Sequence, residues 1–195
     1  MFLVKMGHLT FFIFLEDIMK NFKVKKMTFS AMIATIYFAC CFVNPSFASG
    51  AIQCRVAEGL CLLPLFFKEA IIGVVIGCLI FNITQGIWYD IVFGTLATLL
   101  ACLTTYFIGR LIKKDWLRII LGGLPAVIFN AFIIPFVLIK GYEIPDGYWY
   151  LFLTVGLGEL LAVYVVGGSI YFPLKKLFIH QGISEDLLHN EKTDE

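Results

Sequence analysis

Three carboxylates stand out in this sequence because they lie within or beside long apolar stretches. They are Glu58, Asp90 and Glu159. A charged side chain near the centre of a lipid bilayer costs roughly 2.5 to 3.5 kcal/mol on insertion scales, so such residues are candidates for a functional site. Glu159 is the strongest candidate, because it lies about ten residues into an apolar stretch, which is roughly 15 Å of helix.

Polar residues accompany these carboxylates. Arg55 lies three positions before Glu58, so the two would share a helix face, either as an ion pair that fixes the helix entry or as a polar wall of an externally open pocket. Gln53 lies in the same stretch. Asp90 either caps the helix that it begins or contacts a ligand. A buried Asn130 needs partners, so it either joins two helices or contacts a ligand.

Trp88 and Tyr89 directly precede Asp90. Aromatic residues at the ends of apolar stretches usually form an interfacial belt, although a ring can also stack on a planar ligand. Across these regions the polar groups are expected to converge toward the outer half of the membrane. We therefore expect a cavity there that binds a small polar solute.

The residue types argue against an enzyme or a metal site. The three histidines lie in the terminal segments, and the six cysteines form no CxxC pair, so neither a zinc site nor a disulfide framework is indicated. Ser169 is a conceivable nucleophile, but no membrane histidine or evident lysine base accompanies it. We predict that the chain is not an enzyme.

The composition shows which elements must position these side chains. The chain has 195 residues, of which 60% are apolar and 15% are charged, with a mean hydropathy of +0.90. Soluble domains average about 45 to 50% apolar and about 25% charged residues. Because a transmembrane helix takes about 20 mostly apolar residues, this content suits roughly five or six spans. We predict an all-α integral membrane protein.

The apolar stretches predict a six-helix transmembrane bundle without strands. The stretch 56–67 is too short to cross a bilayer of about 30 Å, so we expect a short helix packed inside the bundle. This bundle forms a membrane domain over 27–174, between an N-terminal segment 1–26 and a polar cytoplasmic tail 175–195. The predicted helices are 27–48, 56–67, 70–87, 91–108, 119–139 and 148–174.

Lysine and arginine positions predict the orientation, since cytoplasmic connections carry an excess of these residues. They precede the first predicted helix, follow the second, separate the fourth from the fifth and follow the sixth, whereas the opposite connections contain only Arg55 and Lys140. This alternation predicts that both termini lie in the cytoplasm. We expect the bundle to lie in the plasma membrane of a prokaryotic cell. A net charge of +1 gives no field that would attract nucleic acid.

Residues 1–18 do not fit this scheme, because their apolar run is too short for a span or a signal peptide. Residues 15–19 could be encoded by TTG GAG GAT ATT ATG, which contains a purine-rich ribosome-binding sequence ahead of a start codon. We therefore expect translation to begin at Met19, so that residues 1–18 are not translated in the cell.

Small residues recur at four-residue spacing along the first predicted helix. One set is Ser30 and Ala34, and the other is Ala31, Thr35 and Ala39. Such stripes let two membrane helices approach closely. We expect this surface to contact a partner subunit.

Three blocks of sequence resemble the QueT family, the queuosine-precursor substrate-binding components of energy-coupling factor (ECF) transporters. They are IQCRVAEGLCLLPLF at 52–66, DIVFGTLATLL at 90–100 and GLGEL at 156–160. The resemblance extends over about residues 27–174, with the blocks in the right order. Cys54 and Cys61 depart from the family pattern, in which bulkier or hydroxyl residues are expected.

The resemblance implies an ECF S component, a six-helix subunit that captures a 7-deazaguanine base. It implies association with a transmembrane coupling subunit and two cytoplasmic ATPases, which use the ATP, so that this chain carries no cofactor of its own. The chain also lacks the GxxxxGK[ST] motif of such ATPases. The small-residue stripe matches the place where S components contact the coupling subunit.

The acidic residues suit such a cargo. A guanine-type edge presents adjacent N1–H and amine donors that one carboxylate accepts together, a role that fits Glu159 or Glu58. A 7-aminomethyl substituent would be cationic near neutral pH, which gives a role to a second carboxylate, either Asp90 or Glu58.

The other polar and aromatic residues complete the expected site. Arg55 or Gln53 could donate to the purine carbonyl, and Trp88 or Tyr89 offers a stacking face. Two alternatives stay open: an S component for another vitamin-like solute, and a self-sufficient ion-coupled permease with Glu159 as its proton relay.

Overall fold

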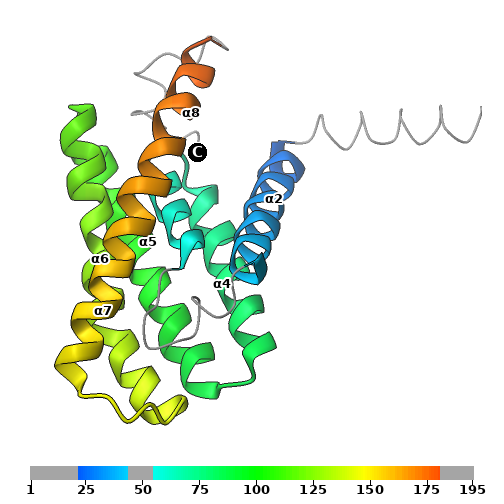
Figure 1. Cartoon of the computed structure of the whole chain (residues 1–195). Helices are drawn as coiled ribbons and strands as arrows, with labels where there is room; N and C mark the ends of the chain where they lie inside the picture. Colours follow the sequence, from blue (N-terminus) through cyan, green and yellow to red (C-terminus); the bar gives the residue numbers. More distant parts are fainter. Residues whose placement is uncertain (1–21, 44–54, 181–195) are drawn as a thin grey trace, which may run out of the picture.

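The computed structural model describes residues 22–43 and 55–180, and these residues are helical without any strand (Figure 1). The predicted start at Met19, Gln53 and most of the predicted tail lie outside them. The helices are α2 (Phe22–Val43), η1 (Val56–Leu65), α4 (Glu69–Gln85), η2 (Asp90–Gly94), α5 (Thr95–Leu111), α6 (Asp115–Gly141), α7 (Tyr148–Leu160), η3 (Leu161–Gly167) and α8 (Gly168–His180).

Three continuous helical stretches are long and apolar enough to cross a membrane. They are Asp90–Leu111, Asp115–Gly141 and Tyr148–Lys176, with mean hydropathies of 2.0, 2.2 and 1.8. Shorter apolar helices cover Lys26–Phe42, Val56–Leu65 and Glu69–Gln85. The prediction of an all-helical, multi-pass membrane protein is thereby confirmed, whereas the number of crossings and their orientation stay predictions.

The 3-10 helix η1 lies in the middle of the fold, where it packs against α5 and η3 (Figure 1). Its residues from Ala57 to Leu65 are buried. Gly59 permits this placement, because a Cβ atom at this position would lie 2.8 Å from the carbonyl oxygen of Ala162 and 2.8 Å from the amide nitrogen of Gly167. The short apolar stretch is therefore an interior helix, as its length indicated.

The helices α2 and α4 cross closely at one side of the molecule. A Cβ atom at Gly73 would lie 2.6 Å from the carbonyl oxygen of Ser30, and one at Gly77 would lie 2.7 Å from that of Ala34. Ser30 and Ala34 are correspondingly buried. These two small residues, expected at a partner surface, thus pack within the chain, because the glycines of α4 allow the backbones to meet.

The other small residues of α2 lie on a different face. Ala31, Thr35 and Ala39 are exposed, and the Thr35 hydroxyl donates to the carbonyl oxygen of Ala31 within the helix. The two sets that the sequence suggested for one surface are therefore divided between the contact with α4 and the outside of the molecule.

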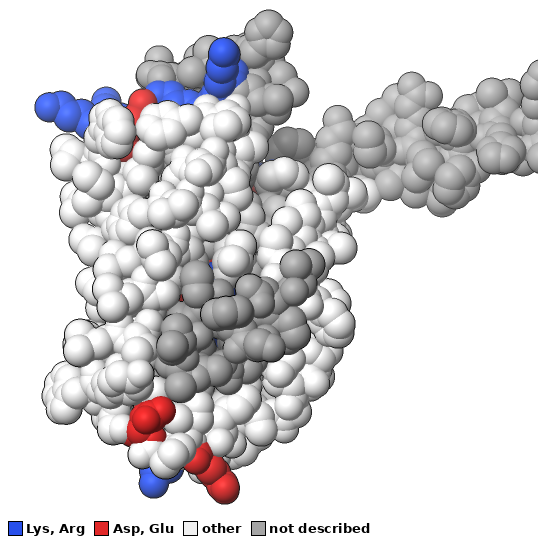
Figure 2. All heavy atoms as spheres, in the orientation of Figure 1, with Lys and Arg blue, Asp and Glu red and all other residues white. Residues whose placement is uncertain are grey.

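Basic side chains gather at one end of the molecule. An ion pair of 2.6 Å joins Lys175 of α8 to Asp115 at the start of α6, and one of 3.0 Å joins Lys26 of α2 to Glu69 at the start of α4. Figure 2 shows most lysine and arginine atoms of the visible face at one end, with a wide belt of other residues beside it. This charge distribution is what the lysine and arginine pattern predicted.

We predict that Gly59→Ala destabilises the fold. The added methyl group would overlap the η3 backbone, and overpacking of this kind costs typically about 1 to 3 kcal/mol. Gly168→Ala is the matched control, since a Cβ atom there meets nothing within 4 Å. Thermal unfolding of the purified variants in detergent should show a lower Tm for Gly59→Ala alone; equal Tm values would contradict the close packing of η1 on η3.

Candidate substrate-binding site

A buried ion pair joins the segment before η1 to the start of η2. The Arg55 guanidinium lies 2.8 Å from an Asp90 carboxylate oxygen, and the exposed fractions of the two side chains are 3% and 1%. Arg55 also lies over the ring of Phe81, 5.9 Å from its centroid. The sequence left Arg55 either paired with Glu58 or in a pocket wall, and Asp90 either a helix cap or a ligand contact. In the structure Arg55 pairs with Asp90, 35 positions away.

Two further side chains position Asp90. The Tyr142 hydroxyl donates to Oδ2 of Asp90 at 3.1 Å, and the Asn82 amide donates to its backbone carbonyl at 2.9 Å. The second contact suits the π-helical turn η2, whose changed hydrogen-bond pattern leaves carbonyl groups for side chains. Oδ1 of Asp90 and Oδ1 of Asn82 are buried acceptors without a hydrogen-bond partner in the described part of the chain.

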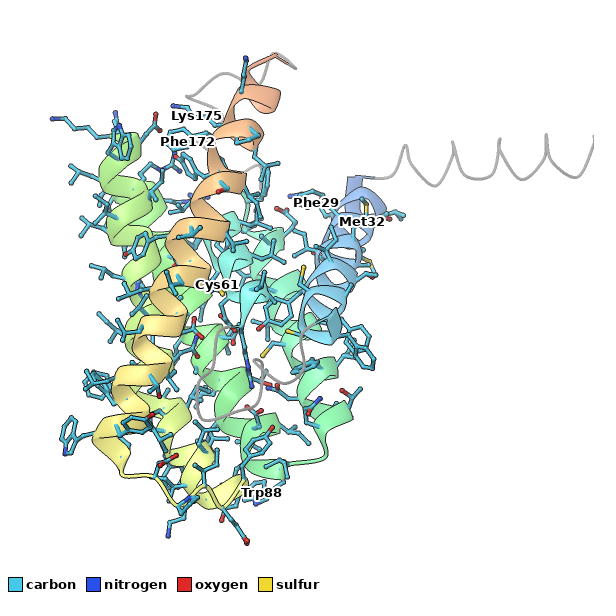
Figure 3. The ribbon with its side chains drawn as sticks, viewed as in Figure 1. Phe29, Met32, Cys61, Trp88, Phe172 and Lys175 are labelled. Carbon is cyan, nitrogen blue, oxygen red and sulfur yellow. The ribbon has the colours of Figure 1, made fainter. Side chains whose placement is uncertain are left out.

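Glu58 is enclosed by hydrogen-bond donors from three helices. Its Oε1 accepts from the Tyr37 hydroxyl of α2 at 2.5 Å and from the Thr98 hydroxyl of α5 at 3.3 Å. Its Oε2 accepts from the Cys61 thiol at 2.9 Å, and Cys61 lies in the interior of the molecule (Figure 3). Both oxygens of Glu58 are therefore engaged by the protein itself, which leaves this carboxylate little capacity for a ligand.

Glu159 differs from Glu58 in its hydrogen bonding. It lies at the end of α7, is only 1% exposed, and interacts with Asn130 of α6. The contact between the two side chains does not have the geometry of a hydrogen bond, and Oε2 of Glu159 and Nδ2 of Asn130 have no hydrogen-bond partner among the residues described. Glu58 and Arg55 lie within electrostatic range of Glu159. The structure thus brings a buried acceptor and a buried donor together at the strongest candidate residue.

The two predicted aromatic residues, Trp88 and Tyr89, differ in burial. Trp88 is 60% exposed, and it lies at the end of the molecule opposite Lys175 (Figure 3). Tyr89 is half-buried and packs against Phe93 and Phe136, with ring centroids 6.4 and 6.1 Å away. The position of Trp88 is that of an interfacial residue.

Several residues of the polar network were not predicted from the sequence. Tyr37 and Tyr142 gave no signal, because a tyrosine in an apolar stretch is common and its hydrogen-bond partner is distant in the chain. Asn82 and Thr98 are polar residues in apolar stretches, which is the only available signal. The cysteines Cys61, Cys78 and Cys102 line the same interior; within the described ranges, no group of histidine, cysteine or acidic residues could hold a metal ion.

The helical architecture and the buried, incompletely hydrogen-bonded polar cluster define a multi-pass membrane protein with a candidate solute site. Its sequence matches the family model described as "QueT transporter" over residues 27–176. The chain therefore belongs to the QueT transporter family, which confirms the resemblance found in its sequence blocks.

A relative from Lactococcus lactis subsp. cremoris (strain MG1363) is named "Queuosine precursor transporter QueT" and is 35% identical over 101 residues. The aligned region spans 50% of this chain and 59% of the relative. No solved structure matches the chain.

We predict that the Arg55–Asp90 pair is essential for stability. Asp90→Asn removes an anionic partner of a buried guanidinium, and breaking a buried pair costs about 3 to 5 kcal/mol, or a decrease in Tm of roughly 10 °C. Arg55→Met combined with Asp90→Asn should be less destabilising than the sum of the single changes, because neither position then carries a buried charge without its partner. Thermal unfolding in detergent measures this, with Asp146→Asn as control; strict additivity would contradict the coupling.

Proposed function

We propose that this chain is the substrate-binding membrane subunit, or S component, of an ATP-driven ECF importer for a queuosine precursor, a 7-deazaguanine base. The family membership and the name of the Lactococcus lactis relative support the cargo class. The observation that carries the proposal is the buried pair of Glu159 and Asn130, each with an atom that lacks a hydrogen-bond partner in the described structure.

The chemistry of this pair complements a guanine-type edge. Oε2 of Glu159 accepts, and Nδ2 of Asn130 donates, whereas the base offers N1–H and amine donors beside a carbonyl acceptor. A carboxylate that receives two such donors forms charge-assisted hydrogen bonds, which are stronger than neutral ones. We therefore assign the base edge to Glu159 and the carbonyl to Asn130, in preference to Glu58, whose oxygens are already engaged.

Asp90 is our choice for a cationic substituent on the base. Its Oδ1 lacks a hydrogen-bond partner in the described structure, while Oδ2 is held by Arg55 and Tyr142. In this assignment Arg55 acts indirectly, by fixing the orientation of Asp90. Tyr89, rather than the exposed Trp88, is the aromatic residue that we assign to stacking on the base.

We further propose how the chain lies in the membrane and which subunits it contacts. The six helical segments form the bundle, the lysine-rich end faces the cytoplasm and the chain lies in the cell membrane. A coupling subunit contacts the exposed face of Ala31, Thr35 and Ala39, and two ATPases attached to that subunit use the ATP. This chain is not an enzyme and needs no cofactor.

The test of the cargo is calorimetry on the purified chain. We expect a 7-deazaguanine to bind with a Kd below about 1 μM, which corresponds to roughly 8 kcal/mol or more. Thiamine, riboflavin and biotin should bind more weakly, and tighter binding of any of them would reject the proposed cargo. Uptake by the chain alone, driven by a proton gradient in proteoliposomes, would instead favour the ion-coupled permease.

We predict that Glu159→Gln weakens binding roughly ten- to hundred-fold, because hydrogen bonds to charged groups contribute about 1.5 to 3 kcal/mol and the amide faces one donor of the base with its own donor. The Tm should change little, since the volume is kept and a buried charge is removed. Glu143→Gln, in the exposed connection after α6, is the matched control. Unchanged affinity together with a lower Tm would make Glu159 a structural residue.

We predict that Ala31→Trp abolishes copurification with the coupling subunit but leaves deazaguanine binding intact, because a bulky side chain on this face would hold two helices apart. Leu153→Trp is the control, since Leu153 lies on α7, away from this face, and is 61% exposed. Ala34→Trp is unsuitable, because Ala34 packs against α4. Normal uptake by Ala31→Trp would exclude this face as the interface.

A further inference from the structure

Arg118 is a buried cation that lies outside the cluster around Glu159. It belongs to the first turn of α6 and is only 2% exposed. Asp115 lies within electrostatic range of it, but the Asp115 oxygens accept from Lys175 and Tyr171. In the described part of the chain, no carboxylate forms an ion pair with Arg118, and its Nε atom has no hydrogen-bond partner. Such a charge is costly to bury, so a gain in stability does not account for it.

The Arg118 guanidinium contacts the end of η1. Its Nη2 group donates to the backbone carbonyl of Leu65, the last residue of that helix. The last carbonyl groups of a helix have no partner within the helix, and their partial negative charge favours a cation. Leu65 also packs closely on α5 and α6, because a Cβ atom at Gly122 would lie 2.8 Å from its Cδ2 and one at Gly109 would lie 3.1 Å from its Cα. The end of η1 is therefore fixed against these two helices.

The start of η1 is held by a second buried guanidinium. Arg55 directly precedes the helix and pairs with Asp90. The helix η1 needs such support, because 3-10 runs longer than three or four residues are uncommon and η1 has ten residues. Its conformation is therefore imposed by contacts with the rest of the bundle, including one arginine at each end.

Both carboxylates that we assign to the cargo adjoin η1. Asp90 is oriented by Arg55 at the start of the helix. Glu159 lies two residues before η3, and η1 packs against η3 at Gly59. A displacement of η1 would therefore change the positions of Asp90 and Glu159 relative to each other.

We propose that Arg118 is a positioning residue of the solute site, which fixes η1 through the Leu65 carbonyl and thereby holds Asp90 and Glu159 in place for the cargo. Arg118 does not itself touch the cargo, because Leu65 lies about 14 Å along η1 from Glu58 at the 3-10 rise of about 2 Å per residue. The effect on cargo binding rests on the proposed function. The effect on η1 does not, since it can be measured in the empty chain.

Cys61 reports on η1 without any cargo. It lies on η1, is 1% exposed and should react slowly with a membrane-permeant maleimide. Arg118→Met removes a hydrogen bond from a charged group, so local opening of η1 and labelling of Cys61 should increase roughly tenfold. Cys78, which is buried on α4 outside η1, should stay protected. Peptide mass spectrometry of the labelled, purified full chain measures each cysteine separately.

Deazaguanine binding is measured on the same variants by calorimetry. Arg118→Met should weaken it about three- to thirty-fold, as expected for a residue that acts without touching the ligand. Arg118→Lys keeps a charged N–H donor and should restore most of the affinity and of the Cys61 protection. Thr105→Val is the matched control, because it removes a buried hydrogen bond to the Gly122 carbonyl but none to η1. It should keep both, even if its Tm falls.

Three results would overturn the proposal. Two are wild-type Cys61 protection and wild-type deazaguanine affinity in Arg118→Met. The third is equal labelling of Cys61 and Cys78, which would show general loosening and a purely structural Arg118. If Arg118→Met does not fold, Arg118→Gln, whose side chain is shorter and uncharged, takes its place with the same expected results. A wild-type chain that binds no deazaguanine would reject the proposed cargo, whereas Cys61 labelling would still decide whether Arg118 fixes η1.

Discussion

The structure depends on one electrostatic constraint, which is that every charge buried in this apolar bundle needs a partner. Desolvation of an ion costs several kcal/mol, and only close, well-oriented partners offset it. Arg55 and Asp90 satisfy this requirement together, and their contact joins the start of η1 to the start of η2. The position of the short interior helix, and hence of Glu58 on it, is therefore fixed by a pair of residues that are far apart in the chain.

The two buried glutamates, Glu58 and Glu159, differ in how far their carboxylate oxygens are hydrogen-bonded. Glu58 is surrounded by Tyr37, Thr98 and Cys61, whose donors engage both carboxylate oxygens. Glu159 keeps an oxygen without a partner in the described structure, although it is equally buried. A fully hydrogen-bonded carboxylate stabilises the bundle around it, whereas an incompletely bonded one is suited to receive donors from a solute.

The sequence predicted the helices well and the side-chain partners poorly. Long apolar runs identify helices such as α6 directly, because lipid allows few alternatives. The partner of Arg55 was not predictable in this way, since the nearest carboxylate in sequence, Glu58, is not the one that its side chain reaches. The small residues of α2 are a second example of contacts that the sequence did not predict. Consecutive helical residues are rotated by about 100°, so Ala34 packs on Gly77 while Thr35 is exposed.

The helix α2 has two faces with different surroundings. Its inner face is fixed by Gly73 and Gly77 of α4, which let the backbones approach, and by the Tyr37 hydrogen bond to Glu58. These contacts do not involve the outer small residues, so their exposure creates no packing defect in the bundle. Ala31, Thr35 and Ala39 therefore lie on the outside of a helix whose position is set by its other face.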